Sequence, residues 1–405
     1  MSKVLLAFSG GLDTSFCAIY LHKELQLEVH TATVNTGGFS SEEIEDIEAR
    51  ATQLGSKGHQ TLDVVKAYYD QCVRFLVYGN VLKNHTYPLS VSAERAFQAL
   101  ALIQYAKEIG ATHIAHGSTG AGNDQVRFDL IFQTLAPEIE IITPIRDLKL
   151  SREAEVAYLK ENGVEIDGSK AAYSINQGLW GTSVGGKETL NSWDHLPDAA
   201  FPSPLEAQGE QLVELHFEKG ELKGIDGQTY AHPADAIDAL EQLAKPFAVG
   251  RDTHVGDTII GIKGRVGFEA AAALITIEAH RLLEKHVLSK WQQHWKDQLG
   301  NWYGMLLHEG QFLEPVMRNV EAFLTDTQET VTGKVKVRLS PYRFEALGIE
   351  SRHDLMASKF GTYGEMNLAW TGEDVKGFTK IISNAGKIYH QVNPGAFNHF
   401  QSTEE

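Results

Sequence analysis

The chain has 405 residues, of which 42% are hydrophobic and 22% charged, and this composition predicts a folded protein of about two domains rather than a disordered chain. Its 53 acidic residues outnumber its 36 basic residues, and the net charge of −17 at pH 7 repels nucleic acid, so we expect no nucleic-acid partner. No apolar run approaches the roughly 20 residues of a membrane helix, and Met1 leads into a predicted strand rather than a signal peptide, so we expect a cytoplasmic protein without a membrane partner.

The first predicted strand, Val4 to Phe8, is followed by the run Ser9-Gly10-Gly11-Leu12-Asp13-Thr14-Ser15, in which a helix begins. A strand that ends at a helix N-terminus directs a row of backbone N–H groups at one point, where the helix dipole adds positive potential. Gly10 and Gly11 permit a tight path and the close approach of a ligand, and the hydroxyl side chains can donate to it. The run therefore predicts a phosphate-binding loop.

This loop matches neither of two common nucleotide-binding patterns, because it lacks both G-x-x-x-x-G-K-[ST] and G-x-G-x-x-G. It resembles the pyrophosphatase loop of enzymes that cleave ATP between the α and β phosphates and adenylate an oxygen. Asp13 could orient the loop, cap the helix or face a Mg²⁺ ion. The structural alternative is a glycine-rich turn after a buried strand.

As far as Pro144, short apolar strands alternate with amphipathic helices. The predicted elements are a helix from Leu12, a strand over Val29 to Val34, helices over Glu42 to Leu54 and Ser92 to Ile109, and a strand from His113 that runs into a second glycine-rich loop. Gly110 is the expected stop of the helix before it. This alternation indicates a parallel sheet covered on both faces, with ligands at the carboxyl ends of the strands.

The second loop, Gly117 to Phe128, has three glycines and a dense group of polar side chains. Thr119 and Asn123 can donate to a carboxylate, Asp124 can accept from an ammonium group, and Arg127 can hold an anion through two hydrogen bonds. Together these groups suit an amino acid, and the alternative is a plain loop. Because the net charge opposes anionic ligands, a phosphate site also needs local cations, for which the candidates are Arg95, Arg127, Lys263 and Arg265.

The second half of the chain has an α+β pattern. Trp180 to Pro204, with its prolines and glycines, is predicted to be a long irregular connection. The tail over Asp374 to Val392 predicts an amphipathic helix that packs either on another subunit or on its own chain. The remaining predicted elements are strands over Glu210 to Gly220 and Gly333 to Leu339 and helices over Pro233 to Leu243 and within Ala270 to Leu307.

Several stretches taken together resemble the argininosuccinate synthase family. They are the opening loop, Tyr87-Pro88-Leu89, the run H-G-S-T-G-A-G-N-D-Q-V-R-F from His116, Tyr173-Ser174, Leu179-Trp180-Gly181-Thr182-Ser183, Val249-Gly250-Arg251 and Thr332-Gly333. They follow the family's order over most of residues 3 to 340. The resemblance implies an enzyme of arginine biosynthesis that joins citrulline to aspartate while ATP is cleaved to AMP and pyrophosphate through an adenylated ureido intermediate.

The same resemblance implies a fold class and an assembly. The expected class is α/β, with a parallel-sheet nucleotide-binding domain at residues 1–168, an α+β synthetase domain at 169–372 and a C-terminal oligomerisation helix within 373–405. The enzyme would be a homotetramer that uses ATP as co-substrate together with Mg²⁺. Its other partners would be small molecules, namely aspartate and citrulline or an N-acylcitrulline.

Site residues also follow from the resemblance. ATP contacts fall on Ala7, Phe8, Ser9, Gly10, Gly11, Leu12, Asp13, Thr14, Ser15, Val34 and Gly117. Aspartate contacts fall on Thr119, Asn123 and Asp124, and citrulline contacts on Tyr87, Ser92, Asn123, Arg127, Ser174 and Ser183. Asp124, Arg127 and Asp13 are the catalytic candidates. Asp124 would act either as a general base for the aspartate amine or as a salt-bridge partner that only holds the ammonium group.

The chain departs from the family pattern at Gly256 to Glu269. Family members usually carry E-N-R-x-x-G-x-K-S-R-G-x-Y-E there, so the Glu and the Tyr that hold the amino-acid end of citrulline are Gly256 and Phe268 in this sequence. Loss of the carboxylate is costly unless the ligand lacks an ammonium group, and the glycine is expected to open space. We therefore hypothesise an N-acylated citrulline as substrate, for example an N-acetyl or N-succinyl form. The alternative is that Asp257 or another nearby acid substitutes and ordinary citrulline binds.

Other readings fit part of the sequence. A tRNA-modifying thiolase with a pyrophosphatase loop would need a basic face and reactive cysteines, whereas Cys17 and Cys72 lie in apolar helical patterns that predict buried thiols. An amidotransferase synthetase would need a glutaminase nucleophile. A non-catalytic nucleotide sensor would keep the first loop and lose the citrulline pocket, which Gly256 and Phe268 favour and the second loop disfavours.

Overall fold

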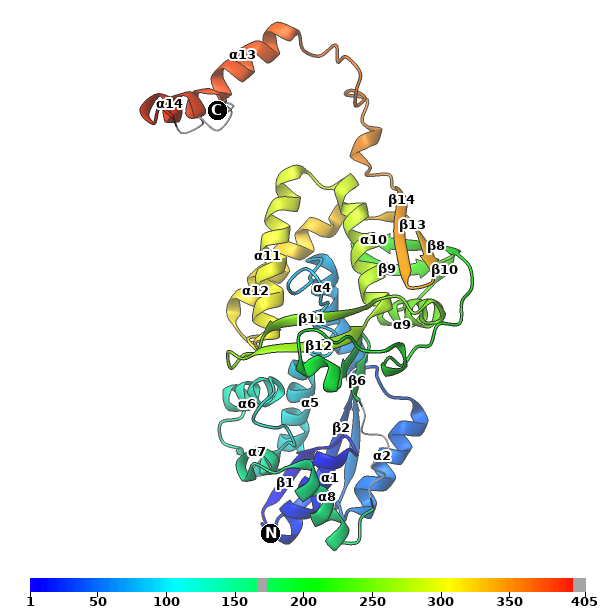
Figure 1. Cartoon of the computed structure of the whole chain (residues 1–405), viewed down its shortest axis with the longest axis vertical. Coiled ribbons are helices and arrows are strands. Elements are labelled where there is room, and N and C mark those ends of the chain that lie inside the picture. The colour runs from blue at the N-terminus through cyan, green and yellow to red at the C-terminus, as the bar shows by residue number, and fades with distance from the viewer. Residues whose placement is uncertain (166–172, 396–405) are drawn as a thin grey trace, which may run out of the picture. The chain divides into compact units, whose positions relative to one another are not determined.

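The computed structural model describes residues 1–165 and 173–395. The chain forms two compact units, Met1–His353 and Asp354–Glu405 (Figure 1). The expected domain boundary at residues 168 and 169 lies outside the described residues, as do residues 396–405 of the expected tail.

Five parallel strands form the first sheet, in the order β3-β2-β1-β4-β5, which confirms the predicted parallel sheet. The order reverses at β1, since β2 pairs with it on one side and β4 on the other. In sheets of this kind ligands bind where the carboxyl ends of such strands diverge, here β1 and β4. The strands are β1 (Lys3–Ala7), β2 (Glu28–Asn35), β3 (His59–Asp63), β4 (His113–Ala115) and β5 (Glu140–Ile142).

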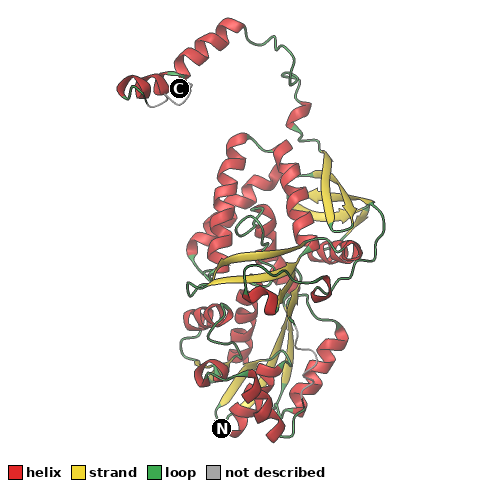
Figure 2. Ribbon diagram, in the orientation of Figure 1, coloured by secondary structure: helices red, strands yellow, loops and turns green. Residues whose placement is uncertain are grey.

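Helices cover both faces of this sheet, because successive side chains of a strand point to opposite sides (Figure 2). Val4 and Leu6 belong to a core cluster with α1 (Leu12–Lys23), α2 (Ser41–Gln53), α7 (Pro144–Leu148) and α8 (Arg152–Glu161). Leu5 belongs to a second cluster with α5 (Glu94–Glu108) and α6 (Asp124–Leu135). The helices predicted before Pro144 are confirmed to within two residues, as α1, α2 and α5, and Gly110, with φ of +67°, follows the end of α5 as expected.

Two antiparallel sheets make up much of the rest of the first unit. One has the order β11-β12-β7-β6 and the other the order β10-β9-β8-β13-β14. Their strands are β6 (Ser174–Gly178), β7 (Gly181–Gly185), β8 (Gln211–Glu218), β9 (Glu221–Ile225), β10 (Gln228–Thr229), β11 (Arg251–Asp257), β12 (Lys263–Glu269), β13 (Gly333–Ser340) and β14 (Arg343–Glu350). The accompanying helices are α3 (Val65–Tyr68), α4 (Arg74–Tyr78), α9 (Pro233–Ala244), α10 (Ala271–Val287), α11 (Lys290–His308) and α12 (Pro315–Thr327).

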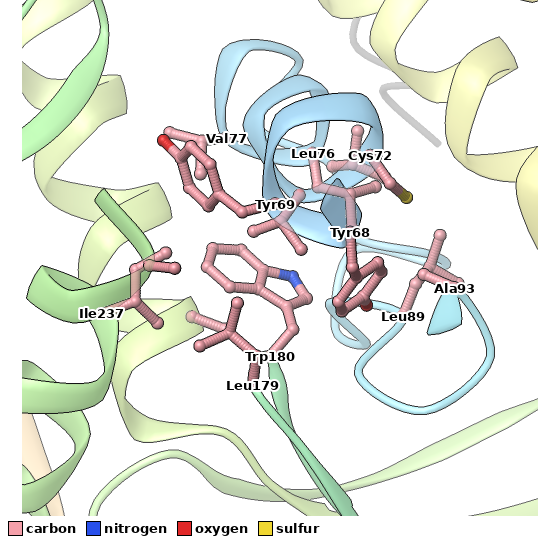
Figure 3. Close-up of a cluster of buried hydrophobic side chains, with 14 of the residues drawn as sticks. Tyr68, Tyr69, Cys72, Leu76, Val77, Leu89, Ala93, Leu179, Trp180 and Ile237 are labelled. Carbon is pink, nitrogen blue, oxygen red and sulfur yellow. The ribbon is translucent and has the colours of Figure 1, made fainter. Parts of the chain in front are cut away.

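The prediction of an irregular connection over Trp180 to Pro204 is wrong for its first residues, Trp180 to Gly185, whereas the rest of the segment is irregular apart from two short 3₁₀ helices. Trp180 is fully buried near Tyr68 and Tyr69, and its indole Nε1 donates to the Pro88 carbonyl oxygen at 2.9 Å (Figure 3). The chain then forms β7, which pairs with β6 on one side and β12 on the other, and short 3₁₀ helices follow. A segment with two glycines has little strand propensity of its own, so pairing on both sides decides its conformation.

The tail forms two helices, α13 (Gly372–Ile382) and α14 (Asn384–Val392), where one helix was predicted. The break lies at Ser383, whose hydroxyl donates to the Lys380 carbonyl at 2.9 Å, a local bond that competes with helix continuation. Within residues 1–165 and 173–395, no helix is both long and apolar enough to cross a membrane. Exposed apolar side chains occur along both tail helices, at Val375, Phe378, Ile381, Ile382, Ile388, Tyr389 and Val392.

Candidate active site

Two loops meet at the carboxyl ends of β1 and β4, because these strands pair with Leu6 opposite Ala115. A Cβ atom added to Gly117 in the second loop would lie only 3.2 Å from the Asp13 Cβ in the first, so a larger side chain would push the loops apart. Together with residues of β6, β7, β11 and β12, the two loops line a cavity of about 1060 Å³. The predicted phosphate loop and the predicted amino-acid loop therefore share one cavity.

Most of the predicted ATP contacts line this cavity. They are Ala7, Phe8, Ser9, Gly11, Leu12, Asp13, Thr14, Val34 and Gly117. Gly10 does not line it; its φ of +72° makes the turn, and an added Cβ would meet Ile47 at 3.4 Å. Ser15 is buried, and its hydroxyl has no hydrogen-bond partner among the described residues. The turn at Gly10 thus shapes the loop, while its neighbours form the surface.

His116 fixes the second loop, a role that the sequence did not reveal. The Ser118 N–H donates to its Nδ1 at 3.3 Å, so the ring proton lies on Nε2, which is 2.9 Å from Asp129 Oδ1. Arg146 donates to the other carboxylate oxygen of Asp129 at 2.6 Å. These hydrogen bonds connect the end of β4 and the second loop to Asp129 on α6 and Arg146 on α7. The only signal in the sequence was a His and an Asp 13 residues apart.

Asp124 lies between two arginines at the start of α6. Arg95 Nε donates to Oδ2 and Arg127 Nη1 donates to Oδ1, each at 3.0 Å. Burial acts to raise the pKa of the Asp124 carboxyl, but the two guanidinium groups outweigh it and lower the pKa to about 2. Asp124 is therefore an anion at neutral pH and a weak proton acceptor.

Arg127 is buried behind Asp124 and is not among the residues that line the cavity. Its Nε and Nη2 donate to the His308 carbonyl oxygen at 3.0 and 2.8 Å. The contact of Arg127 with citrulline stays a prediction. Of the other predicted amino-acid contacts, the cavity brings together Tyr87, Ser92, Thr119, Asn123, Asp124, Ser174 and Ser183.

The space beside Gly256, which we expected to be open, is filled by an imidazole. His254 lies two residues earlier on the same face of β11, and a Cβ added to Gly256 would lie 2.7 Å from its Nε2. The His254 ring stacks on Tyr87 with 5.0 Å between centroids. Phe268, the second departure from the family pattern, is fully buried and does not line the cavity. Its ring packs against Tyr87, with 5.3 Å between the ring centroids.

His254 and His308 both line the cavity beside this strand, with ring centroids 6.3 Å apart. Burial, aided by Lys83, lowers the pKa of His254. Burial together with Arg127, Lys83 and His254 lowers the pKa of His308 to about 3. The His254 Nδ1 and the His308 Nε2 are buried and have no hydrogen-bond partner among the described residues. This end of the cavity thus offers neutral imidazole groups close to cations.

Two of the four predicted cations, Arg95 and Arg265, line the cavity, whereas Arg127 and Lys263 do not. Lys263 instead pairs with Asp257 at 2.6 Å. Arg152, the first residue of α8, also lines the cavity, and no motif in the sequence had singled it out.

Comparison with known proteins gives matches along the chain. Residues 3–165 match the family model described as "Arginosuccinate synthase N-terminal HUP domain", and residues 173–389 match "Arginosuccinate synthase C-terminal domain". A curated argininosuccinate synthase of Dictyoglomus turgidum is 36% identical over 392 residues, with 96% of this chain and 97% of the relative covered. One of Xanthomonas campestris pv. campestris is 37% identical, with 96% and 98% covered. One of Methanocaldococcus jannaschii is 34% identical, with 90% and 92% covered.

Proposed function

We propose a mechanism for this cavity, given that the chain belongs to the argininosuccinate synthase family, as the family models and the curated relatives show. The chain is therefore an ATP-dependent ligase of arginine biosynthesis that joins a citrulline-type substrate to aspartate. The observation that carries the proposed mechanism is the shared cavity, in which the phosphate loop and the amino-acid loop are in contact through Gly117 and Asp13.

In the first step, the ureido oxygen attacks the α-phosphorus of ATP. A bond forms between these two atoms while the bond from the α-phosphorus to the oxygen shared with the β-phosphate breaks, and pyrophosphate leaves with that electron pair. The backbone N–H groups at the start of α1 and the hydroxyls of Ser9 and Thr14 stabilise the departing charge. The product is an adenylated isourea, and no covalent bond to the protein is required.

In the second step, the neutral amine of aspartate attacks the activated ureido carbon and AMP leaves. The Asn123 Oδ1 accepts from the Ile259 N–H at 2.8 Å, so its NH₂ group is free to donate to a carboxylate of aspartate. Asp124, with a pKa of about 2, suits a group that holds the ammonium form more than one that removes its proton. The proton passes to water before the attack.

A Mg²⁺ ion would enter with the nucleotide. The described residues contain no group of three or more His, Cys, Asp or Glu side chains that could hold a metal. Mg²⁺ in nucleotide sites usually needs only one or two protein carboxylates besides phosphates and water. Asp13 lines the cavity within the first loop and fits that requirement. The Mg²⁺ ion would neutralise part of the phosphate charge.

For the ureido substrate, the local charge favours a citrulline whose α-amine is acylated. At the position of the family's carboxylate, the chain has Gly256 covered by the neutral His254, with Lys83 close enough to lower the pKa of that imidazole. Asp257, the alternative acid, is already paired with Lys263 at 2.6 Å. An ammonium group would find no free carboxylate among these residues, whereas the oxygen of an amide can accept from an imidazole N–H.

Pyrophosphate release tests this proposal. The enzyme is incubated with ATP, Mg²⁺ and aspartate, and with citrulline, N-acetylcitrulline or N-succinylcitrulline in turn. We expect release with an acylated substrate at a kcat/KM at least about tenfold above that of citrulline, the size of one lost polar contact. A clear preference for free citrulline ends the acyl assignment, and no release with any substrate contradicts the mechanism itself.

A pair of variants links the preference to the imidazole. Gly256→Glu combined with His254→Ala restores a carboxylate and removes the ring with which it would collide. We expect this double variant to shift the preference toward free citrulline by about tenfold or more. His254→Ala alone is the matched control, because it opens the same space without adding the charge. An unchanged preference in the double variant would place the determinant elsewhere.

We also propose the domain division given by the resemblance, with residues 1–168, 169–372 and 373–405 as nucleotide-binding domain, synthetase domain and tail, and a homotetrameric assembly. The two family models support the first boundary, since one ends at 165 and the next begins at 173. The exposed apolar side chains of α13 and α14 support a role of the tail in assembly.

A further inference from the structure

The triphosphate of ATP is the most highly charged group that the cavity must hold, and the net charge of −17 on the chain opposes it. The first loop, Ser9 to Ser15, contains no lysine or arginine. Three arginines line the cavity, counted over the described residues: Arg95, Arg152 and Arg265. These are the side chains that could supply permanent positive charge directly to the phosphates.

Arg95 is already engaged by the protein. Its guanidinium donates to Glu94 at 2.9 Å, to Gln98 and Asp124 at 3.0 Å and to Asn176 at 3.3 Å. Two of these acceptors, Glu94 and Asp124, are carboxylates, so they neutralise most of the positive charge of the Arg95 guanidinium.

Arg265 is engaged as well, although by neutral groups. Its guanidinium donates to three backbone carbonyl oxygens, those of Asn191, of Asp194 at 3.0 Å and of Glu188 at 3.4 Å. These bonds hold the segment after β7 against β12 and fix the position of the guanidinium. Neither Arg95 nor Arg265 is therefore free to follow a leaving group.

Arg152 differs from both. Its side chain is exposed, and within the described part of the chain its guanidinium makes no hydrogen bond or ion pair. One turn further along α8, the Glu155 carboxyl lies within hydrogen-bonding reach of Asp13. The Tyr158 ring packs on Phe16 of α1 with 4.9 Å between centroids. These contacts place the start of α8 beside the first loop, with Arg152 facing the shared cavity.

We propose that Arg152 binds the β- and γ-phosphates of ATP and the pyrophosphate formed from them. The inference rests on the proposed function and deepens it by naming the side chain that takes the charge of the leaving group. A planar guanidinium can give two parallel hydrogen bonds to phosphate oxygens. Among the described residues, Arg152 interacts with Glu153 and Glu155 only through their charge, so it can bind phosphate without breaking a hydrogen bond. Pyrophosphate carries more charge than the same phosphates within ATP, so the contact strengthens as the bond breaks.

Three variants test the proposal in the full-length protein. Arg152→Ala removes the cation, Arg152→Lys keeps the charge without the paired geometry, and Lys160→Ala removes an exposed cation from the far end of the same helix. The measurements are the KM for ATP, the inhibition constants of pyrophosphate and of AMP, the KM for aspartate, and the direct binding of pyrophosphate by calorimetry. The melting temperature of each variant is recorded beside them.

For Arg152→Ala, we expect the KM for ATP, the inhibition constant of pyrophosphate and its dissociation constant from calorimetry to rise about tenfold or more, as for loss of a charge-assisted hydrogen bond. The inhibition constant of AMP and the KM for aspartate should stay within about twofold of the wild type. Arg152→Lys should lie between, and Lys160→Ala should match the wild type. Unchanged pyrophosphate binding in Arg152→Ala, or an equal loss in Lys160→Ala, overturns the inference. If the wild type released no pyrophosphate from ATP, the proposed function would fall, and calorimetry would still decide the role of Arg152.

Discussion

Two roles are open to Asp124, a general base for the aspartate amine or a partner that only holds the ammonium group, and the surroundings of its carboxylate favour the second. Arg95 and Arg127 each donate to one of its oxygens at 3.0 Å, and together they lower the pKa of its carboxyl to about 2, so the group is ionised at neutral pH. A carboxylate in that state can anchor an ammonium group but takes a proton poorly at neutral pH. This difference between anchoring and proton transfer can be measured.

We expect Asp124→Asn to lower kcat/KM for aspartate by about a hundredfold, because the substituted amide takes the carboxylate partner from Arg127, leaves Arg95 with Glu94 alone, and loses the ammonium contact. The shape of the pH profile of the remaining activity between pH 6 and 9 should not change, since Asp124 does not titrate there. Steady-state rates across that range are the measurement. Disappearance of a limb of the profile in the variant would identify Asp124 as a proton acceptor after all.

His308 predicts a pH dependence of stability. Its pKa falls from 6.5 to about 3 on folding, so its contribution is fully present above pH 6.5 and is lost as pH falls toward 3. Between pH 7.5 and pH 5 this costs about 2 kcal/mol of the free energy of unfolding, from 1.36 kcal/mol per pKa unit.

His308→Gln, which cannot titrate, should therefore lose less stability than the wild type between pH 7.5 and pH 5, as measured by denaturant or thermal unfolding. His22→Gln, at an exposed histidine, is the control and should keep the wild-type slope. Equal slopes in all three proteins would show that the His308 imidazole does not resist protonation.

At this scale the sequence predicted the residues that lie within motifs and missed those that tertiary contacts recruit. Asp13, Asn123 and Asp124 were found because each stands at a fixed offset from a glycine-rich turn. His116 could not be assigned a role, since its partner Asp129 is on α6. Arg152 looked like any exposed helix arginine, because only the packing of α8 on α1 turns it toward the cavity.

Among the elements, the alternation of strands and helices predicted a parallel sheet with ligands at the carboxyl ends of its strands, and the pairing of β1 with β4, which was not predicted, places the two loops side by side. The opposite wall of the cavity was not predictable in the same way. It uses Ser174 in β6 and Ser183 in β7, which form a hairpin, although the composition had predicted an irregular connection from Trp180 onward. Strand pairing on both sides of β7, rather than propensity, makes it a strand.

Gly38 tests how this hairpin is attached to the parallel sheet. The Leu179 N–H donates to the Thr36 carbonyl at 2.9 Å, and a Cβ added to Gly38 would lie 1.9 Å from the Gln177 carbonyl oxygen. We expect Gly38→Ala to destabilise the protein by about 1–3 kcal/mol, since backbone must shift to relieve the collision. Gly209→Ala, where no atom lies within 4 Å, is the control. Equal melting temperatures for the two variants would show that the close approach carries no stability.

At the scale of the whole molecule, the unit Met1–His353 has its own cores, whereas α13 and α14 leave apolar side chains in water, with Ile381 71% and Val392 72% exposed. Faces of this kind mark contact surfaces. We expect a chain ending at His353 to stay folded and to form a smaller assembly than the full chain, for which we propose a tetramer. Light scattering coupled to size-exclusion chromatography measures both masses. The same number of chains per particle in both proteins would exclude the tail from assembly.

The proposed reaction begins when the ureido oxygen attacks the α-phosphorus of ATP in the cavity shared by the two loops. Transfer of an oxygen label can follow this attack. The better ureido substrate is prepared with ¹⁸O in its ureido group and turned over with ATP and aspartate, and the products are examined by mass spectrometry. We expect AMP that carries one ¹⁸O atom and pyrophosphate that carries none. AMP without label, or ADP and phosphate as products, would contradict it.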